Sequence, residues 1–343
     1  MDLVSVLNRL SAAHGPSGAE YQARELAREL LVPYMDEVSI DALGNVIGTR
    51  SCGKPRAKRV LLEAHIDEVG FVVTGHRGSF LTLSNLGSID PRLLPGTRLR
   101  VLTDTQHLGV IAFLPPHILS GSEMDKVMPL SDLALDLGLT EDEAKTIPLG
   151  TPVVYDTVPM PMGDGLFAGK ALDNRASLSA LLLTLERLPH SLDFDLIVLA
   201  SAQEELGLRG AIPGGYTTAP DLVIAVDVTF AHTPDASLDE TVRLGGGAAI
   251  GIGPVLDRGL STRLRELAEA HDIPHQFEIL AGKTSTTADM LHVTRAGVKT
   301  ALISLPLRYM HSANELVSLA DIESVSALLT AFLEDFDGGA VYA

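Results

Sequence analysis

Four apolar runs constrain the fold of this chain more than any other feature. They cover residues 60–64, 196–200, 222–226 and 301–305 and consist almost entirely of Val, Leu, Ile and Ala. Parallel strands that are covered by helices on both faces read as such continuous apolar runs. The sequence therefore predicts an α/β fold with a central sheet flanked by helices.

The segments between these runs carry helix and hairpin signals. Residues 3–13, 19–32, 173–188 and 319–335 have the spacing of helices. The last of these has Ser318 as an expected N-cap, with Asp321 three residues later. Residues 38–48 are predicted to form a hairpin that turns at Gly44-Asn45. The hairpin makes the predicted central sheet a mixed one.

Residues 69–163 differ in sequence pattern from the rest of the chain. Short β-rich pieces alternate there with Gly, Pro and Asp turns, which is typical of a small β-barrel or sandwich. None of the candidate metal ligands comes from this range. We therefore expect an inserted β-rich domain at 69–163 and a discontinuous catalytic domain made of 1–68 and 164–343.

Composition narrows the possible partners and the compartment. The formal net charge is −18, from 44 acidic and 26 basic residues, which argues against nucleic acid or an anionic membrane as a partner. The single Cys52 cannot form an internal disulfide, which fits a reducing compartment. Residues 1–10 lack the pattern of a signal peptide, and no apolar run approaches the length of a membrane span. A soluble cytoplasmic protein is expected.

Polar side chains that suit metal binding follow the predicted strands. The carboxyl ends of parallel strands meet at one edge of an open α/β sheet, where ligands bind. Two imidazoles and several carboxylates at that edge predict a metal site for two ions. The candidate residues are His65, Asp67, Asp173, Glu204, Glu205, Asp227 and His311.

Each candidate ligand has a chemical role in a two-metal site. Such sites need a bridging group between the ions as well as terminal ligands. Asp173, at a predicted helix start, can offer one carboxylate oxygen to each ion. His65 and His311 would each bind one ion through a ring nitrogen, and Glu205 and Asp227 would complete the two ligand sets.

Two further acids have catalytic roles in this hypothesis. Glu204 stands beside Glu205 and would act as the general base on the attacking water. Asp67, two residues after His65, would orient the imidazole ring through a hydrogen bond.

The order of the motifs resembles a known family over nearly the whole chain. The tetrahedral aminopeptidases, which include glutamyl and leucyl aminopeptidases and proteins once labelled cellulase M, show similar sequences. The matching segments lie at residues 16–18, 43–45, 64–70, 172–175, 204–211 and 305–312.

The resemblance implies a zinc-exopeptidase fold of the phosphorylase/hydrolase-like type with an inserted, PDZ-like barrel for dimerisation. It implies zinc or cobalt as the metal, short peptides as substrates and a homododecamer as the assembly. It also implies the ligand sets: His65, Asp173 and Asp227 on one ion, and Asp173, Glu205 and His311 on the other, with Glu204 as base and Asp67 supporting His65.

The segment 281–289 departs from the family pattern. A Gly-Gly-Thr-Asp-Ala motif is usual there, whereas this chain has Thr286, Thr287 and Ala288 followed by Asp289. Two alternatives stay open: Asp289 takes the place of the missing acid, or this chain has no acid with that role. Lys283 in the same loop would favour acidic residues at the peptide N-terminus, unless it is a solvated loop lysine.

An aminopeptidase acting on short peptides is the first functional hypothesis. A related two-metal deacylase or carboxypeptidase acting on N-acylated amino acids or peptides is the alternative. A glycosidase is disfavoured, because its two carboxylates must flank the sugar bond about 5 Å or more apart, whereas Glu204 and Glu205 are adjacent. A non-catalytic, metal-stabilised assembly protein is the third reading.

Overall fold

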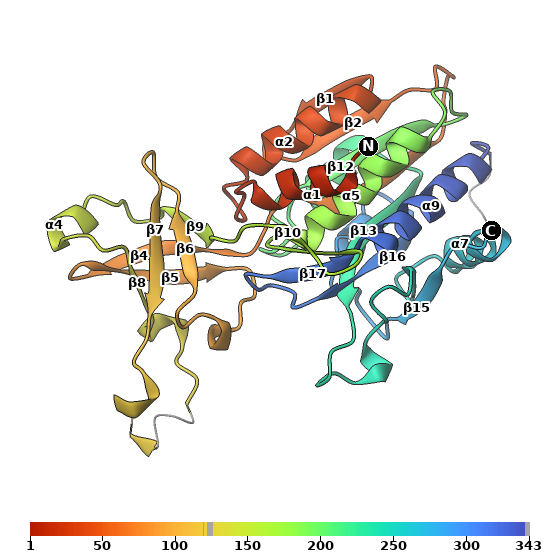
Figure 1. The fold of residues 1–343 in the computed structure, drawn as a ribbon. Coiled ribbons are helices and arrows are strands. Elements are labelled where there is room, and N and C mark those ends of the chain that lie inside the picture. The colour runs from red at the N-terminus through yellow and green to blue at the C-terminus, as the bar shows by residue number, and fades with distance from the viewer. Residues whose placement is uncertain (119, 122–125, 340–343) are drawn as a thin grey trace.

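Two sheets organise the chain in the computed structural model, which describes residues 1–118, 120–121 and 126–339. One is an eleven-stranded mixed sheet flanked by helices, and the other closes into a six-stranded antiparallel barrel. The barrel projects from one side of the larger part of the molecule (Figure 1). The predicted mixed α/β fold with a small barrel is confirmed.

The large sheet contains the four predicted apolar runs at its centre. Strands β12, β3, β13 and β16 lie side by side and are mutually parallel. Antiparallel strands extend the sheet at both ends, and β14 and β15 branch from β16. In sheet order the strands are β1 (Glu37–Ile40), β2 (Val46–Arg50), β12 (Asp195–Ser201), β3 (Arg59–His65), β13 (Leu222–Phe230), β16 (Lys299–Arg308), β17 (Glu315–Ser318), β11 (Leu166–Gly169) and β10 (Met160–Met162), with β14 (Ala248–Ile252) and β15 (His275–Ile279) beside β16.

Helices cover both faces of this sheet. On one face, α5 and α9 pack side by side over the central strands, and α1 and α7 contribute to the same core. On the other face, α6 and α8 cover the opposite side chains of the same strands. The helices are α1 (Leu3–Ala12), α2 (Tyr21–Leu31), α5 (Leu172–Arg187), α6 (Ala211–Thr218), α7 (Arg258–Ala270), α8 (Ala288–Leu291) and α9 (Leu319–Asp335).

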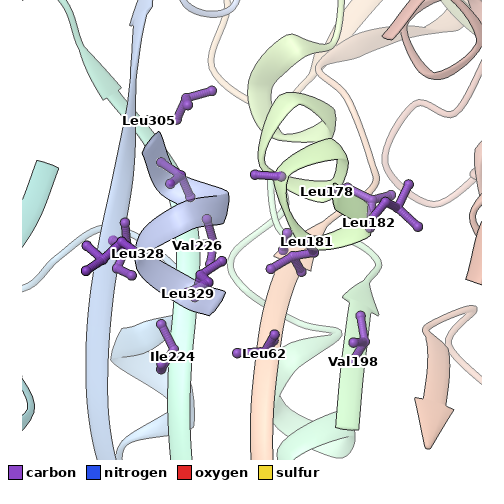
Figure 2. Close-up of a cluster of buried hydrophobic side chains, with 14 of the residues drawn as sticks. Leu62, Leu178, Leu181, Leu182, Val198, Ile224, Val226, Leu305, Leu328 and Leu329 are labelled. Atoms are coloured by element: carbon purple, nitrogen blue, oxygen red, sulfur yellow. The ribbon is translucent and has the colours of Figure 1, made fainter. Parts of the chain in front are cut away.

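The main core lies between the sheet and the α5–α9 pair. Leu178 and Leu181 of α5 and Leu328 of α9 share this core with strand residues such as Leu62 and Ile224 (Figure 2). Successive residues of a strand face opposite sides, so Leu62 enters this core while its neighbours face α6 and α8. Burial of each such side chain contributes about 1.5–3 kcal/mol, which fixes the strand ends in place.

The barrel has its own hydrophobic core. Phe71 and Tyr155 meet edge to face inside it, with ring centroids 5.6 Å apart. In barrel order its strands are β4 (Gly70–Arg77), β5 (Phe80–Leu86), β8 (Ala134–Asp136), β7 (His107–Ala112), β6 (Arg98–Val101) and β9 (Pro152–Tyr155). β10 also lies within the range 69–163 but pairs with β11 in the large sheet.

Short elements complete the description. Helix α4 (Glu141–Ala144) belongs to the barrel segment. The 3-10 turns are η1 (Val32–Tyr34), η2 (Pro91–Leu93), η3 (Pro116–Ile118), η4 (Leu130–Asp132) and η5 (Leu238–Glu240). Within the residues that the structure covers, no helix combines the length and apolar character needed to cross a membrane.

The start of α9 differs from the expectation. The helix covers the predicted residues, but the Ser318 side chain makes no capping hydrogen bond. The carboxylate of Asp321 instead accepts the backbone N–H groups of Gly245 and Gly247, both at 2.7 Å. Ser318 thus holds the predicted N-cap position without a side-chain cap, and the acid three residues later is used for a long-range contact.

The core position of Leu181 generates a stability prediction. Leu181→Ala should lower the free energy of unfolding by about 2–5 kcal/mol, because the side chain is fully buried and its loss leaves a cavity. Leu238→Ala, at a residue that is 74% exposed, should change it by less than about 0.5 kcal/mol. Urea unfolding of both variants at one protein concentration is the measurement. Equal effects would contradict this assignment of the core.

Candidate metal centre

The structure brings the seven predicted site residues together at the carboxyl edge of the parallel strands. His65 ends β3, Asp227 lies in β13, and His311 follows β16. Asp173 lies in the first turn of α5, and Glu204 and Glu205 follow β12. The polar groups meet at this edge because helices and apolar side chains cover both faces of the sheet.

Asp173 lies between the two histidines. Its Oδ1 is 3.0 Å from His65 Nε2, and its Oδ2 is 3.2 Å from His311 Nε2. On the far sides, His65 Nε2 is 3.8 Å from Asp227 Oδ1, and His311 Nε2 is 3.1 Å from Glu205 Oε1. Asp173 therefore has the position that a carboxylate bridging two ions needs.

Two groups of potential ligand atoms fit the dimensions of an ion site. His65, Glu204 and Asp227 form one group, and His65, Asp173 and Glu205 form the other, with the atoms of each group within 4.8 Å of one another. Imidazole nitrogens and carboxylate oxygens together suit divalent ions such as zinc and cobalt. The donor set therefore fits a divalent metal. These groups differ from the sequence-based scheme, since Glu204 lies within ligand distance, His65 belongs to both groups and His311 belongs to neither.

The crowding and burial of these acids shift their pKa values strongly, and that of the neighbouring His311 as well. Burial, with Asp227 and Glu205 nearby, raises the pKa of Glu204 to about 9. Burial lowers the pKa of His311, but the hydrogen-bonded Asp173 and Glu205 outweigh it and raise this pKa to about 11. Burial likewise raises the pKa of Asp227 well above its usual range. Such a cluster gains protons or metal ions to balance its negative charge.

Asp67 contacts both His65 and the Glu204–Glu205 turn. Its side chain is fully buried, with Oδ1 accepting the N–H of Glu204 at 3.0 Å and Oδ2 that of Glu205 at 3.1 Å. The Ser17 hydroxyl also donates to Oδ2. The second ring nitrogen of His65 is 3.5 Å from Asp67 Oδ1 and 3.2 Å from its backbone oxygen. Asp67 thus lies where it can orient the imidazole and also fixes the turn of the two glutamates.

Backbone geometry around the ligands is unusual. Three ligand-bearing turns contain non-glycine residues with left-handed φ, a conformation that side chains disfavour. These residues are Ala171, Gln203, Leu208, Tyr309 and His311. Such conformations persist only where the surrounding structure holds them in place.

Sequence reasoning missed a buried ion cluster behind the site. Glu68 accepts hydrogen bonds from Lys170 at 2.7 and 2.8 Å and from Arg175 at 3.3 Å. Arg175 also donates to backbone oxygens of Ile66 and Leu10. These charged residues stand inside the motifs that carry the ligands, which is the signal that could have revealed them. They join the N-terminal segment to the turns of His65 and Asp173.

The barrel approaches the site through Gly87. This residue has φ +83°, and a Cβ there would lie 2.8 Å from Val69 Cγ1 and 3.1 Å from Glu205 Oε2. Only glycine fits such a conformation and such a contact without displacement. The loop after β5 therefore packs directly against a candidate ligand.

The loop 281–289 contributes neither of its two candidates to the ligand groups. Asp289 accepts hydrogen bonds from Thr284 N and Oγ1, both at 2.8 Å, and from Ser285 N at 3.0 Å. Lys283 is exposed. The Thr287 hydroxyl donates to the buried Glu63, two residues before His65. The Asp289 carboxylate thus shapes its own loop.

The chain matches a known protein family and a known relative over most of its length. The profile of the M42 glutamyl aminopeptidase family matches residues 44–328. A lysyl aminopeptidase of Pyrococcus furiosus is 31% identical over 337 residues, which cover 96% of each chain.

Solved structures agree over almost the whole chain. An aminopeptidase from the archaeon Desulfurococcus kamchatkensis has a TM-score of 0.91 and 32% identity, covering 98% of this chain and 95% of the other. The TET1 peptidase of Pyrococcus horikoshii, described as assembling into a tetrahedron or a large octahedral shell, has a TM-score of 0.85 and 27% identity, covering 98% of this chain and 100% of the other.

Metal removal provides a direct test of the ligand cluster. Chelation should lower the Tm, and a divalent ion at 100 times its Kd should restore about 2.7 kcal/mol of stability. His311→Ala should retain fewer ions per chain than the wild-type protein, whereas His190→Ala, an exposed residue, should retain the wild-type number. Metal analysis after dialysis is the measurement. Equal metal content in both variants would reject His311 as a ligand.

Proposed function

Because the chain belongs to the M42 glutamyl aminopeptidase family, we propose that it is a two-metal aminopeptidase that removes N-terminal residues from short peptides. Family membership makes it a metallo-aminopeptidase, a hydrolase. The position of Asp173 between His65 and His311 is the observation that supports two ions rather than one.

The ligands would divide between the two ions around Asp173. His65 and Asp227 would hold one ion and Glu205 and His311 the other, in agreement with the short contacts on each side of Asp173. When bound, zinc or cobalt would supply Lewis acidity for the attacking water and the scissile carbonyl.

Glu204 is the proposed general base. It lies beside the ligands, and its N–H is held by Asp67 at 3.0 Å. Its carboxylate would accept a proton from the attacking water and pass it to the departing amine. Burial raises the pKa of Glu204 to about 9, and nearby dications would lower it towards neutral pH, where a general base is most effective.

We also propose that the barrel mediates assembly of a homododecamer. We propose the same division of the chain as above, a catalytic domain of 1–68 and 164–343 and an inserted domain of 69–163, because the barrel has a hydrophobic core of its own. Exposed apolar residues lie along the barrel segment, which supports a contact role: Leu93, Leu108, Val110, Phe113 and Leu114. The TET1 peptidase of Pyrococcus horikoshii can assemble into a tetrahedron or a large octahedral shell, which agrees with a homo-oligomer.

The acidic composition and the single cysteine support a cytoplasmic location without nucleic acid or membrane partners.

Replacing the proposed base tests the mechanism. Glu204→Gln should lower kcat by about 10²–10⁴-fold, because the amide cannot accept the proton, while the protein retains its metal. Glu240→Gln, at an exposed residue, serves as the matched control and should behave as wild type. Steady-state kinetics with metal analysis is the measurement. A near-normal kcat in Glu204→Gln would reject this base assignment.

A substrate panel distinguishes the aminopeptidase from the alternative deacylase or carboxypeptidase. Metal-stripped protein is given zinc or cobalt and tested on free-amine aminoacyl anilides and on their N-acetylated forms. Metal-dependent cleavage confined to the free amines supports the aminopeptidase. Turnover of the blocked forms alone would support the deacylase and point to the altered loop 281–289.

Lys283 gives a test of selectivity. If this exposed lysine favours acidic N-terminal residues, Lys283→Ala should lower the ratio of kcat/KM for Glu-anilide over Leu-anilide by about five-fold, which is about 1 kcal/mol for an exposed ion pair. Lys145→Ala, on the barrel, is the control. An unchanged ratio in Lys283→Ala would mean that this lysine is solvated and has no role in selectivity.

A further inference from the structure

Glu315 is a buried acid that the two-metal mechanism does not use. It is 2% exposed, and both oxygens of its carboxylate accept backbone hydrogen bonds. Oε2 accepts the N–H of Asp173 at 3.0 Å, and Oε1 accepts the N–H of His311 at 2.8 Å. One side chain therefore joins the backbone of the candidate bridging ligand to the backbone of the last candidate ligand.

The strand order explains how Glu315 reaches both residues. It is the first residue of β17, which lies between β16 and β11 in the sheet. β16 leads into the turn that carries His311, and β11 ends at Gly169, directly opposite Glu315 and four residues before Asp173. Both ligand-bearing turns therefore leave the sheet beside this carboxylate.

The two turns need an external support. Ala171, before Asp173, has φ +57°, and Tyr309 and His311 have φ +63° and +62°. Side chains disfavour this left-handed region, so the turns do not maintain their shape by local preference alone. A carboxylate that accepts one N–H from each turn fixes both of them relative to each other.

We propose that Glu315 is a positioning residue that sets the spacing between Asp173 and His311 and thereby the geometry of both metal sites. This inference rests on the proposed two-metal function. Glu315 acts through the backbone of the ligands and does not bind metal or substrate itself. Its removal would leave the ligand side chains present but free to separate.

Asp321 provides a matched comparison within the same chain. It is fully buried, and its two oxygens accept the N–H groups of Gly245 and Gly247, both at 2.7 Å. Its hydrogen-bonding pattern is thus the same as that of Glu315, but neither partner is a candidate ligand. A merely structural role for Glu315 would make the two residues equivalent.

The experiment compares Glu315→Gln with Asp321→Asn in the full chain. Each amide keeps the side-chain volume but replaces one acceptor oxygen by a donor that faces a backbone N–H. Zinc affinity is measured by competition with a chelator, together with kcat, KM and the Tm of the metal-free protein. Glu315→Gln should weaken zinc binding about 10–100-fold and lower kcat more than it changes KM. Asp321→Asn should lower only the Tm.

Two outcomes would overturn the inference. Either Glu315→Gln binds two zinc ions with wild-type affinity, or Asp321→Asn weakens zinc binding to the same extent. If Glu315→Gln does not fold, the same measurements on Glu315→Asp replace it, since aspartate keeps both acceptor oxygens on a shorter chain. Wild-type zinc affinity in Glu315→Asp would overturn the proposal, and weakened affinity with an intact fold would support it.

The wild-type protein separates this inference from the proposed function. If it binds two zinc ions and cleaves free-amine anilides, a normal Glu315→Gln variant rejects only the positioning role. If the wild-type protein binds no second ion and cleaves no anilide, the proposed function itself fails.

Discussion

The parallel register of the central strands is the constraint on which the rest of the structure depends. His65 of β3 lies opposite Ser201 of β12, and Asp227 of β13 lies opposite Ser304 of β16. Apolar cores cover both faces of the sheet, and the candidate ligands gather at the carboxyl edge of these strands. The candidate ligands therefore come together from segments that are far apart in the sequence, and no long loop is needed to assemble them.

The acids at this edge divide into two groups with different partners. Asp173, Glu205 and Asp227 keep oxygens that face histidines and can receive metal ions. Asp67 and Glu315 instead direct their oxygens at backbone N–H groups of the candidate ligand and base residues. Among the described residues, neither Asp67 nor Glu315 belongs to the two groups of potential ligand atoms. Asp67 and Glu315 thus contact the backbone of the residues whose side chains form the site.

The sequence was informative where a local pattern decides the structure. The four apolar runs became the parallel strands, and the seven predicted site residues, most of which follow these runs, lie together, although their individual roles remain predictions. Glu315 could not be found in this way, because its function depends on β17 lying between β16 and β11. The contacts of Asp321 could not be found for the same reason, since its partners Gly245 and Gly247 lie far away in the sequence.

The strained backbone of this molecule lies in the ligand-bearing turns, whereas its hydrophobic core lies under α5 and α9. Left-handed residues occur in each of the three ligand-bearing turns, and each costs of order 1–2 kcal/mol. The core under α5 and α9 is close-packed and ends at the same edge, so it can offset that cost without extending into the site. The turns are held instead by hydrogen bonds from their backbone N–H groups to the carboxylates of Asp67 and Glu315. The strain at this edge is therefore balanced by local hydrogen bonds, while the fold is maintained by the core.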